Sequence, residues 1–409
     1  MVKTTTIAIA IVVIAIIAVG AYYVTLPAPT ATPTATATAT ATPTAVPETE
    51  IKIGVIVSLT GSESFPGVKS LEGIKMAVEE INAKGGINGK LINLIYYDDA
   101  GDPTQTVALC RRLITSDKVP VGILAVGSET AMAGVPIFQD ARIPVLVPWA
   151  GHPDVTKNNY AFRIGPTAYL EGLAMADFAV NKLDPPVKKA AVIHSGDDPW
   201  ELTICTDAVP KYLAKFGNGA SVVYDKTIEP TEVEFTPMLT EMKNLGVDTI
   251  FVAFDIPQAG PLMKQSAAIG YTSLRMVESD SFDTEEVIAA SGQMDRHYGV
   301  VLVDKWDPTI ATWIDAYTKK WGSGPLGFAS GFCYDAVGVL AQVIGQVGTD
   351  SQAIYNGLEG VKNYKGAGGM IGAWETPQHE VARTIAFGVL HNNEINLANR
   401  VDLSKVPKP

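Results

Sequence analysis

Short apolar runs alternate with helical patterns along most of the chain, and this alternation constrains the fold more than any other feature. The first series comprises "IKIGVIVSL", "LEGIKMAVEEINA", "LINLIYY", "TQTVALCRRLITS", "VGIL", "TAMAGVPIFQDA" and "IPVLVP". The second begins near residue 188 and comprises "KKAAVIHS", "ELTICTDAVPKYLAKF", "ASVVYDKTI", "FTPMLTEMKNLG", "VDTIFVAF", "PLMKQSAAIG" and "LRMVES". Strand, helix and strand at this spacing predict βαβ units on parallel sheets. We therefore expect an α/β protein with two sheets of similar construction.

The length agrees with two lobes, because 409 residues exceed the roughly 250 to 300 at which one core usually divides into domains. After the second series, helices are expected near residues 308–321 and 328–347. Glycine-rich turns and a strand, "RTIAFGVL", follow. This remainder is too small for a third α/β domain, so we expect it to complete the first two.

The stretch "INAKGGINGKLINLIYYDD", residues 81–99, resembles a phosphate-binding loop only superficially. A P-loop runs from a strand through glycines into a helix, whereas here the helix comes first. Gly85 and Gly86 are therefore expected to end that helix in left-handed conformations, and Asn88 and Gly89 to form a tight turn into the next strand. Asp98 and Asp99 end this strand on opposite faces, so they cannot act as facing carboxylates. A structural role in the loop and a ligand contact both remain open for them.

The N-terminus predicts export from the cytoplasm. An uncharged apolar run from Ile7 to Val24 is longer than the about 7 to 15 residues of a typical signal peptide core, which favours a retained membrane anchor within residues 1–25. A signal peptide cleaved at the small residues Val19-Gly20-Ala21 is the alternative. Residues 26–50 are almost entirely Thr, Ala and Pro, a composition that predicts an extended stalk or a disordered linker. No cysteine follows the apolar run, which excludes a lipid-modified N-terminus of the bacterial lipoprotein type.

Composition and motifs exclude several functional classes. With 31 basic and 43 acidic residues and no basic cluster, nucleic acid is not an expected partner. The three cysteines are far apart and the five histidines share no metal-ligand spacing, so no disulfide, metal or other cofactor is expected. G-x-S-x-G, H-E-x-x-H and Walker A motifs are absent, and "GAGGMIG" lacks the third glycine of G-x-G-x-x-G. The sequence therefore predicts a protein that is not an enzyme.

Four segments in this order resemble a known family: "VSLTG", "EEINAKGGINGKLINLIYYDDAGDP", "IPVLVP" and "AFRIGP". They are similar to the type I periplasmic solute-binding proteins of the branched-chain amino acid (leucine/isoleucine/valine) class, and the resemblance covers roughly residues 51–400. It implies two Rossmann-like lobes joined by three crossings, with the ligand in a cleft between them. The first lobe would comprise residues 51–167 with 302–375. The second would comprise residues 168–301 with 376–403.

The resemblance also implies ligand contacts in the first lobe. In "LAVGSETAMAGVP", a strand is followed by Gly127, by Ser128 as the expected N-cap of a helix, and by Thr130 in its first turn. Similar proteins hold the carboxylate of the ligand with hydroxyls and amides at this place, and a helix N-terminus suits an anion. A plain serine cap is the alternative.

The next strand end, "VLVPWAGHPDV", resembles a segment that gives further contacts, here through Trp149, Ala150 and Gly151. Trp149 stands where a small residue is usual, and Gly151 stands where a threonine often touches the ligand. We expect Trp149 either to form a wall of the pocket or to pack beneath a loop.

Three further positions are implied. Asp280 aligns with the acid that pairs with the ligand ammonium in amino-acid-binding members, while Glu278 and Asp283 are competing surface acids. Trp200 and Phe65 lie where the family carries tyrosines that enclose the ligand, and packing roles are the alternative for both.

The resemblance implies a tethered extracytoplasmic receptor that binds an amino acid and delivers it to the permease of an ABC transporter. The ligand-sensing ectodomain of a signalling system is an alternative, because it can share this fold. An aromatic or short-chain carboxylate, or an amide, is the alternative ligand.

Overall fold

The computed structural model describes residues 50–157, 160–196, 198–229, 231–253, 258–279, 282, 297–374, 379, 381, 383–391 and 394–409. These residues belong to one compact unit, Glu48–Pro409. The predicted anchor and all of the predicted stalk except Glu50 lie outside the described residues, so both remain predictions.

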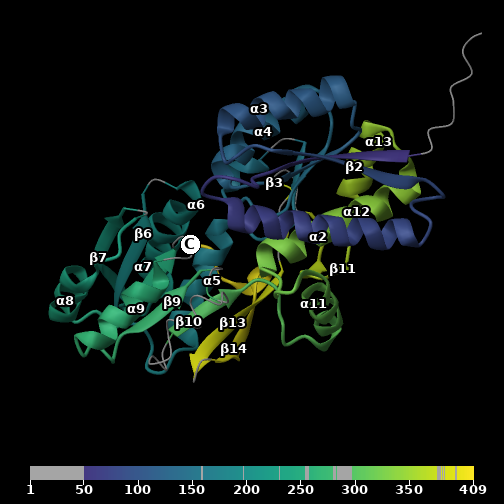
Figure 1. Cartoon of the computed structure of the whole chain (residues 1–409). Coiled ribbons are helices and arrows are strands. Elements are labelled where there is room, and N and C mark those ends of the chain that lie inside the picture. Colours follow the sequence, from purple (N-terminus) through teal and green to yellow (C-terminus); the bar gives the residue numbers. More distant parts are fainter. Residues whose placement is uncertain are drawn as a thin grey trace, which may run out of the picture. The chain divides into compact units, whose positions relative to one another are not determined.

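The first sheet has five parallel strands in the order β2-β1-β3-β4-β5 (Figure 1). Its strands are β1 (Glu50–Val57), β2 (Leu91–Asp98), β3 (Gly122–Ala125), β4 (Val145–Val147) and β5 (Ala161–Arg163). The order reverses between β1 and β3, which is the arrangement of a doubly wound sheet. β1, β3, β4 and β5 are rich in buried Ile, Val, Leu and Phe, as expected for strands covered on both faces.

The second sheet repeats this order and then extends it. Its seven strands run β14-β13-β10-β9-β8-β6-β7. They are β6 (Lys189–Ser195), β7 (Ser221–Ile228), β8 (Thr249–Ala253), β9 (Arg275–Glu278), β10 (His297–Val301), β13 (Thr384–His391) and β14 (Glu394–Asp402). The strands β6, β7, β8, β9 and β10 are parallel to one another, whereas β13 and β14 are antiparallel additions. The α/β fold class with two Rossmann-like sheets is therefore as predicted.

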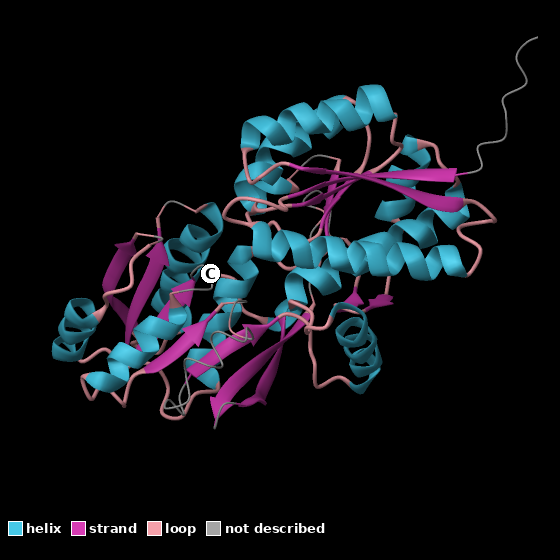
Figure 2. Ribbon diagram, in the orientation of Figure 1, coloured by secondary structure: helices cyan, strands magenta, loops and turns pink. Residues whose placement is uncertain are grey.

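Helices cover both faces of each sheet (Figure 2). Those of the first series are α2 (Ser64–Ala83), α3 (Pro103–Arg112) and α4 (Ser128–Asp140). Those of the second are α5 (Ala168–Asn181), α6 (Pro199–Leu202), α7 (Val209–Phe216), α8 (Thr236–Leu245) and α9 (Ala259–Ala268). One buried cluster joins β1, β3 and β4 to α3 and α4, and another joins β6, β8 and β9 to α8 and α9. A third cluster includes residues of α2, of α5 and of strands from both sheets.

The C-terminal part adds helices beside the first sheet and strands to the second. The helices α11 (Pro308–Trp321), α12 (Phe332–Val347) and α13 (Ser351–Glu359) lie beside the first sheet, where α11 and α12 contact α2. A small hairpin, β11 (Tyr364–Gly366) and β12 (Gly369–Ile371), contains most of the glycine-rich stretch. β13 corresponds to the predicted strand "RTIAFGVL", but β14 was not predicted.

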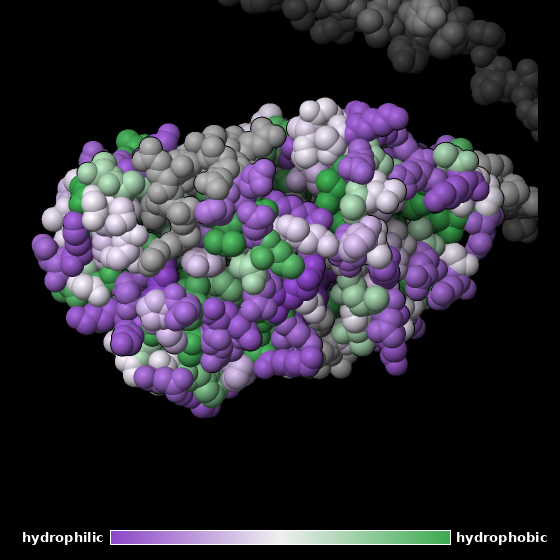
Figure 3. Space-filling model, turned by 90° about the horizontal axis from the view of Figure 1, so that it is seen from below, coloured by the Kyte–Doolittle hydropathy of each residue, from purple (hydrophilic) through white to green (hydrophobic). Residues whose placement is uncertain are grey.

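One described segment, Gly327–Val347, is long and apolar enough to cross a membrane. It includes α12, and 72% of its most apolar window is buried inside the protein. It is therefore a core helix. On the face shown in Figure 3, hydrophilic side chains predominate among the described residues, and hydrophobic ones form small separate groups.

The glycine turn after α2 forms as the sequence predicts. Gly85 and Gly86 have φ of 96° and 74°, and Asn88 and Gly89 have φ of 51° and 81°. The amide of Gly86 donates to Ile81 O at 3.0 Å, which closes the end of the helix. A Cβ on Gly86 would lie 2.1 Å from the carbonyl oxygen of Lys90, whereas a Cβ on Gly85 would meet nothing within 4 Å.

We predict different costs for alanine at these two glycines. Both substitutions strain a left-handed residue by about 1–2 kcal/mol. Gly86→Ala should lower the free energy of unfolding by about 1–3 kcal/mol more than Gly85→Ala, because its Cβ would also push away the backbone of Lys90 in the turn that follows α2. Urea unfolding of both variants measures the difference, and equal losses would contradict the geometry.

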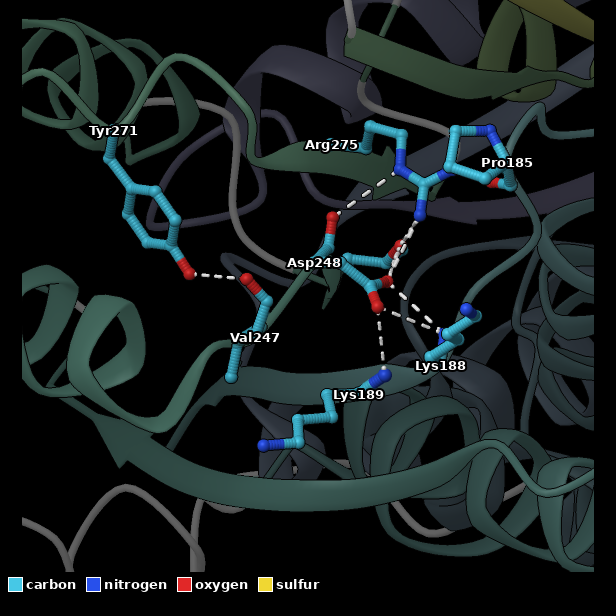
Figure 4. A network of polar contacts seen from close by, with 8 residues as sticks. Pro185, Lys188, Lys189, Val247, Asp248, Tyr271 and Arg275 are labelled. Carbon is cyan, nitrogen blue, oxygen red and sulfur yellow. Dashed lines mark hydrogen bonds and ion pairs between the residues drawn. The ribbon is translucent and has the colours of Figure 1, made fainter.

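A charged network closes the amino-terminal edge of the second sheet (Figure 4). The carboxylate of Asp248 accepts the backbone amides of Lys188 and Lys189 and the Nη2 of buried Arg275, each at 3.0 Å. Another nitrogen of Arg275 donates to the carbonyl of Pro185, and Tyr271 donates its hydroxyl to Val247 O at 2.6 Å. The starts of β6, β8 and β9 are thereby joined.

Removing one partner of this network should be costly. We predict that Asp248→Ala lowers the free energy of unfolding by about 2–3 kcal/mol, because buried Arg275 loses its counter-charge. The loss is below that of a fully buried pair, since the Asp248 side chain is 31% exposed. Asp207→Ala breaks the exposed pair with Lys211 and should change stability by less than about 0.5 kcal/mol. Similar losses in both variants would argue against the network.

Candidate functional site

Each sheet has a point where its strand order reverses, and the loops that flank this point lie at the carboxyl edge of the sheet. In the first sheet these are the loop after β1, which contains Glu63, and the turn after β3, which contains Gly127. In the second sheet the loop after β6 contains Asp198 and leads to Trp200 at the start of α6. Open α/β sheets bind ligands at such points, because the loops diverge there.

Asp98 and Asp99 fasten the loop after β1. Asp98 accepts the amides of Leu59 and Thr60 and the Thr60 hydroxyl, at 2.8, 3.3 and 2.8 Å. The fully buried Asp99 accepts the hydroxyls of Ser58 and Thr106, both at 2.7 Å. These contacts favour the structural interpretation of the aspartate pair.

The N-terminus of α4 differs in detail from the prediction. Gly127, not Ser128, is the N-cap residue, and no side chain caps the helix by a hydrogen bond. The expectation that Ser128 caps the helix is therefore wrong by one position, because Ser128 already has the first helical place. Its hydroxyl accepts the amide of His152 at 3.2 Å, and the Thr130 hydroxyl donates to Gly127 O at 3.0 Å. Both side chains are buried.

The carboxylate of Glu63 occupies the N-terminus of α4. The Gly127 amide donates to its Oε2 at 3.0 Å, and the Ser58 hydroxyl lies 3.3 Å from the same atom. The fit requires glycine at 127, since a Cβ there would lie 1.9 Å from Oε1 of Glu63. Burial raises the pKa of Glu63 from 4.5 to about 7; the Gly127 amide opposes this shift, and the carboxylates of Asp99 and Asp198 add to it.

Trp149, Ala150 and Gly151 follow β4 toward the same edge. The Trp149 indole donates to the hydroxyl of Ser70 at 3.0 Å and meets Phe328 edge-on at 5.6 Å between ring centroids, so it is held against α2 and the turn before α12. Ala150 is buried. Gly151 lies against Trp200, whose indole would be 2.3 Å from a Cβ at that position. The strand end of the first sheet and the start of α6 are therefore in contact.

The remaining predicted residues have different surroundings. Phe65 lies near the start of α2 and is 44% exposed. Asp280 and Asp283 lie outside the described residues. Glu278 was expected to be a surface acid, which is wrong: it is fully buried, and its Oε2 lies 2.6 Å from Nε2 of His297.

Sequence reasoning missed two acids at this edge, Glu63 and Asp198. Asp198 accepts the amides of Trp200 and Glu201 at 2.7 and 3.1 Å, so it caps α6. Each acid follows the first strand of a βαβ series within a few residues, and that position could have singled them out. The described residues contain no group of three or more His, Cys, Asp or Glu side chains arranged to hold a metal ion.

Residues 50–394 match the model of a family described as periplasmic binding protein. An "Amino acid binding protein" of Pseudomonas aeruginosa is 30% identical over 312 residues, which cover 74% of this chain and 80% of that protein. The Leu/Ile/Val-binding protein of Escherichia coli is 29% identical over 224 residues, 54% of this chain and 59% of that protein. The chain thus matches less than two thirds of the length of the E. coli relative.

Solved structures share the fold. A branched-chain amino acid transporter substrate binding protein of Streptococcus pneumoniae, in complex with isoleucine, has a TM-score of 0.75 and 23% identity, over 86% of this chain and 99% of that one. A solute binding protein of an ABC transporter of R. palustris, in complex with benzoate, has a TM-score of 0.72 and 22% identity, over 86% and 98%. These matches confirm the resemblance and the type I fold that it implies.

The raised pKa of Glu63 predicts a pH-dependent stability. The folded protein holds this proton more tightly than the unfolded chain, so the stabilisation present below about pH 4.5 is lost as pH rises toward 7. Relative to wild type, Glu63→Gln should therefore gain on the order of 1–3 kcal/mol in unfolding free energy between pH 5 and pH 8.

Urea unfolding at both pH values measures this gain. Glu129→Gln is the matched control, because Glu129 is an exposed acid in the first turn of α4. An equal gain in the control would assign the effect to general charge rather than to Glu63.

Proposed function

The chain belongs to the periplasmic binding protein family, and on this premise we propose that it captures an amino acid and delivers it to an ABC importer. The match over residues 50–394 carries the proposal, because it spans the first sheet and all of the second except β14. The names of relatives, "Amino acid binding protein" and "Leu/Ile/Val-binding protein", support an amino acid as the ligand. Family membership implies an extracytoplasmic location.

The proposed ligand site lies between the carboxyl edges of the two sheets. Gly151 and Trp200 bring these edges into contact, and the carboxylate of Asp198 acts on Glu63 across them. We propose that residues 51–167 with 302–375 form one lobe and residues 168–301 with 376–403 the other. Ligand between the lobes would favour the closed arrangement, since it contacts both.

We assign the ligand carboxylate to the N-terminus of α4. The Gly127 amide and the hydroxyls of Ser128 and Thr130 are donors that suit it, and the dipole of the helix favours negative charge there. Both hydroxyls have partners within the protein, with Ser128 accepting from His152 and Thr130 donating to Gly127. Thr130 would give up the Gly127 carbonyl when the carboxylate arrives, whereas Ser128 can keep the His152 amide and donate its own hydrogen to the carboxylate.

The other predicted residues would complete the pocket. We propose that Ala150 and Gly151 supply backbone contacts and that Trp149, Trp200 and Phe65 supply apolar walls. Asp280, which lies outside the described residues, keeps its proposed role as the partner of the ligand ammonium. Capture and delivery of a solute need no bond to be broken, so we propose that the protein is not an enzyme.

We further propose that the importer is contacted by both lobes and that the N-terminal segment tethers the protein to the membrane. A permease that binds only the closed conformation would distinguish the loaded receptor from the empty one, because closure fixes the angle between the proposed lobes.

An aromatic carboxylate is the second candidate ligand. The R. palustris neighbour was solved in complex with benzoate. Trp149 also favours such a ligand, since a tryptophan in a pocket can stack on an aromatic ring.

The proposed function predicts stabilisation by an amino acid. A thermal-shift screen of the twenty amino acids, with benzoate and short-chain acids beside them, should show a rise in Tm for at least one amino acid. A rise with benzoate alone would favour the second candidate, and no rise with any of them would sink both.

The proposed carboxylate site at the N-terminus of α4 predicts a loss of ligand affinity when one of its hydroxyls is removed. Thr130→Ala should weaken binding of the ligand found in the screen by roughly 1.5–3 kcal/mol, about 10- to 150-fold, because a hydrogen bond to a charged group is removed. Thr240→Ala is a matched control, since the Thr240 hydroxyl donates to a carbonyl of its own helix in the same way at 2.8 Å. Calorimetry that finds the same affinity in both variants would place the carboxylate elsewhere.

A further inference from the structure

We propose that Glu63 determines the specificity of this site by occupying the place of the ligand carboxylate, so that a ligand binds only if it can displace or neutralise that side chain. This inference rests on the proposed function, because it concerns the same site. It adds a residue that the resemblance to the family does not indicate, and it narrows the ligand class to compounds with a carboxylate.

The geometry gives Glu63 a defined place. Its Oε2 accepts the Gly127 amide at 3.0 Å, and Oε1 lies in the space that a Cβ at 127 would fill. Gly127 has ordinary extended backbone angles, φ −68° and ψ 176°, so its conformation does not require glycine. The absence of a side chain at 127 serves the close approach of this carboxylate.

The surrounding loop is held chiefly by Asp98 and Asp99, since the Ser58 hydroxyl lies 3.3 Å from Glu63 Oε2 but only 2.7 Å from Asp99 Oδ1. Asp98 fixes Leu59 and Thr60, and Asp99 fixes Ser58. Glu63 contributes none of these bonds. Its side chain can therefore leave the N-terminus of α4 while the backbone of the loop stays in place.

The local charge makes a second carboxylate unfavourable there. Asp99, from the end of β2, and Asp198, from the loop before α6, both act on Glu63 with like charge. Within α4 itself, Glu129 is exposed in the first turn. A ligand carboxylate would add another negative charge beside Glu63, and two such groups in contact cannot both remain ionised without a large cost.

Binding of a carboxylate should therefore take a proton from solvent. The proton goes to a carboxylate oxygen of Glu63, which then no longer competes for the Gly127 amide and can donate to the ligand. A pKa of about 7 in the ligand-free protein makes this step accessible near neutral pH. Above that pH, affinity for the carboxylate should fall by up to about tenfold for each pH unit.

The same competition should reject neutral analogues. An amide in place of the ligand carboxylate makes a weaker hydrogen bond to the Gly127 N–H than the ionised Glu63 does. It would have to compete with this carboxylate without a charge of its own. The site should therefore favour a carboxylic acid over its primary amide, and this preference should shrink when Glu63 is neutralised.

The test uses two carboxylates, L-isoleucine and benzoate, and their amides, L-isoleucinamide and benzamide. Calorimetry on the full chain at pH 6 and pH 8, in two buffers of different ionisation enthalpy, measures affinity and proton uptake together. For wild type we expect weaker binding of a carboxylate at pH 8 and uptake of up to one proton. For Glu63→Gln we expect about tenfold tighter binding at pH 8, no proton uptake from this group and a smaller preference over the amide.

Glu129→Gln is the control and should behave as wild type, because Glu129 does not contact the Gly127 amide. Weaker carboxylate binding by Glu63→Gln, with wild-type affinity that rises with pH, would overturn the inference. That result would show that Glu63 binds a donor group of the ligand. Glu63→Ala repeats the comparison if the glutamine variant does not fold.

Failure of the proposed function gives a different result. If neither carboxylate binds to wild type or to Glu63→Gln at either pH, the assigned ligand class is wrong. The position of Glu63 is then tested without ligand, by NMR titration of its side-chain carboxyl carbon. A midpoint near 7 supports the buried position of the Glu63 carboxyl beside Asp99 and Asp198, and a midpoint in the ordinary glutamate range near 4.5 overturns it.

Discussion

The hydrogen bonds of Asp98 and Asp99 to the loop after β1 hold together the edge of the first sheet on which the site depends. The loop must turn away from the strand and then begin α2, and its amides and hydroxyls would otherwise need other partners. Asp99 is fully buried and holds Ser58 and Thr106, so it joins the β1 loop to α3. Because this junction is fixed, the position of the Glu63 backbone relative to Gly127 is fixed as well.

The second constraint is that both sheets reverse their strand order in the same way. In the order β2-β1-β3 and in the order β7-β6-β8 the reversal lies beside the first strand of the series, and doubly wound sheets bind ligands at the carboxyl edge of such points. Gly151 and Trp200 bring the two edges into contact, so that groups at one edge change the electrostatics of the other. Asp198 acting on Glu63 is such a case. A ligand at the proposed site would contact both edges, and the proposed capture by domain closure needs that property.

The sequence predicted what depends on local patterns. Alternating apolar runs and helical patterns indicated two α/β sheets, and the glycines at 85 and 86 indicated the helix end, because positive φ values leave a clear signature. β14 was missed, because its alternation of exposed and partly buried residues is that of an edge strand with little apolar content. The N-cap of α4 was off by one residue, because the chain is already helical at Ser128 and the extended Gly127 precedes it.

The role of Glu63 could not be predicted because it arises from residues 64 positions apart that meet only after the sheet forms. Of the resembling segments, "VSLTG" includes the loop up to Gly61 but stops short of Glu63. Likewise, the contact of Trp149 with Ser70 depends on how α2 crosses the sheet. Ligand contacts at such a site come from several distant segments, so a sequence can indicate the edge where they meet but not which side chains face one another.

The two edges of the second sheet differ: the contacts at the amino-terminal edge stabilise the sheet, and the carboxyl edge borders the proposed ligand site. At the amino-terminal edge, Asp248 and Arg275 satisfy each other and the starts of three strands, which leaves little for a ligand to gain. At the carboxyl edge, the charge of Asp198 acts on another acid, Glu63, which follows β1 of the first sheet. A stable protein tolerates this repulsion only where a partner or a proton relieves it. The excess of negative charge at the carboxyl edges is thus a physical reason to expect that binding there is coupled to proton uptake or to a cationic group such as the ligand ammonium.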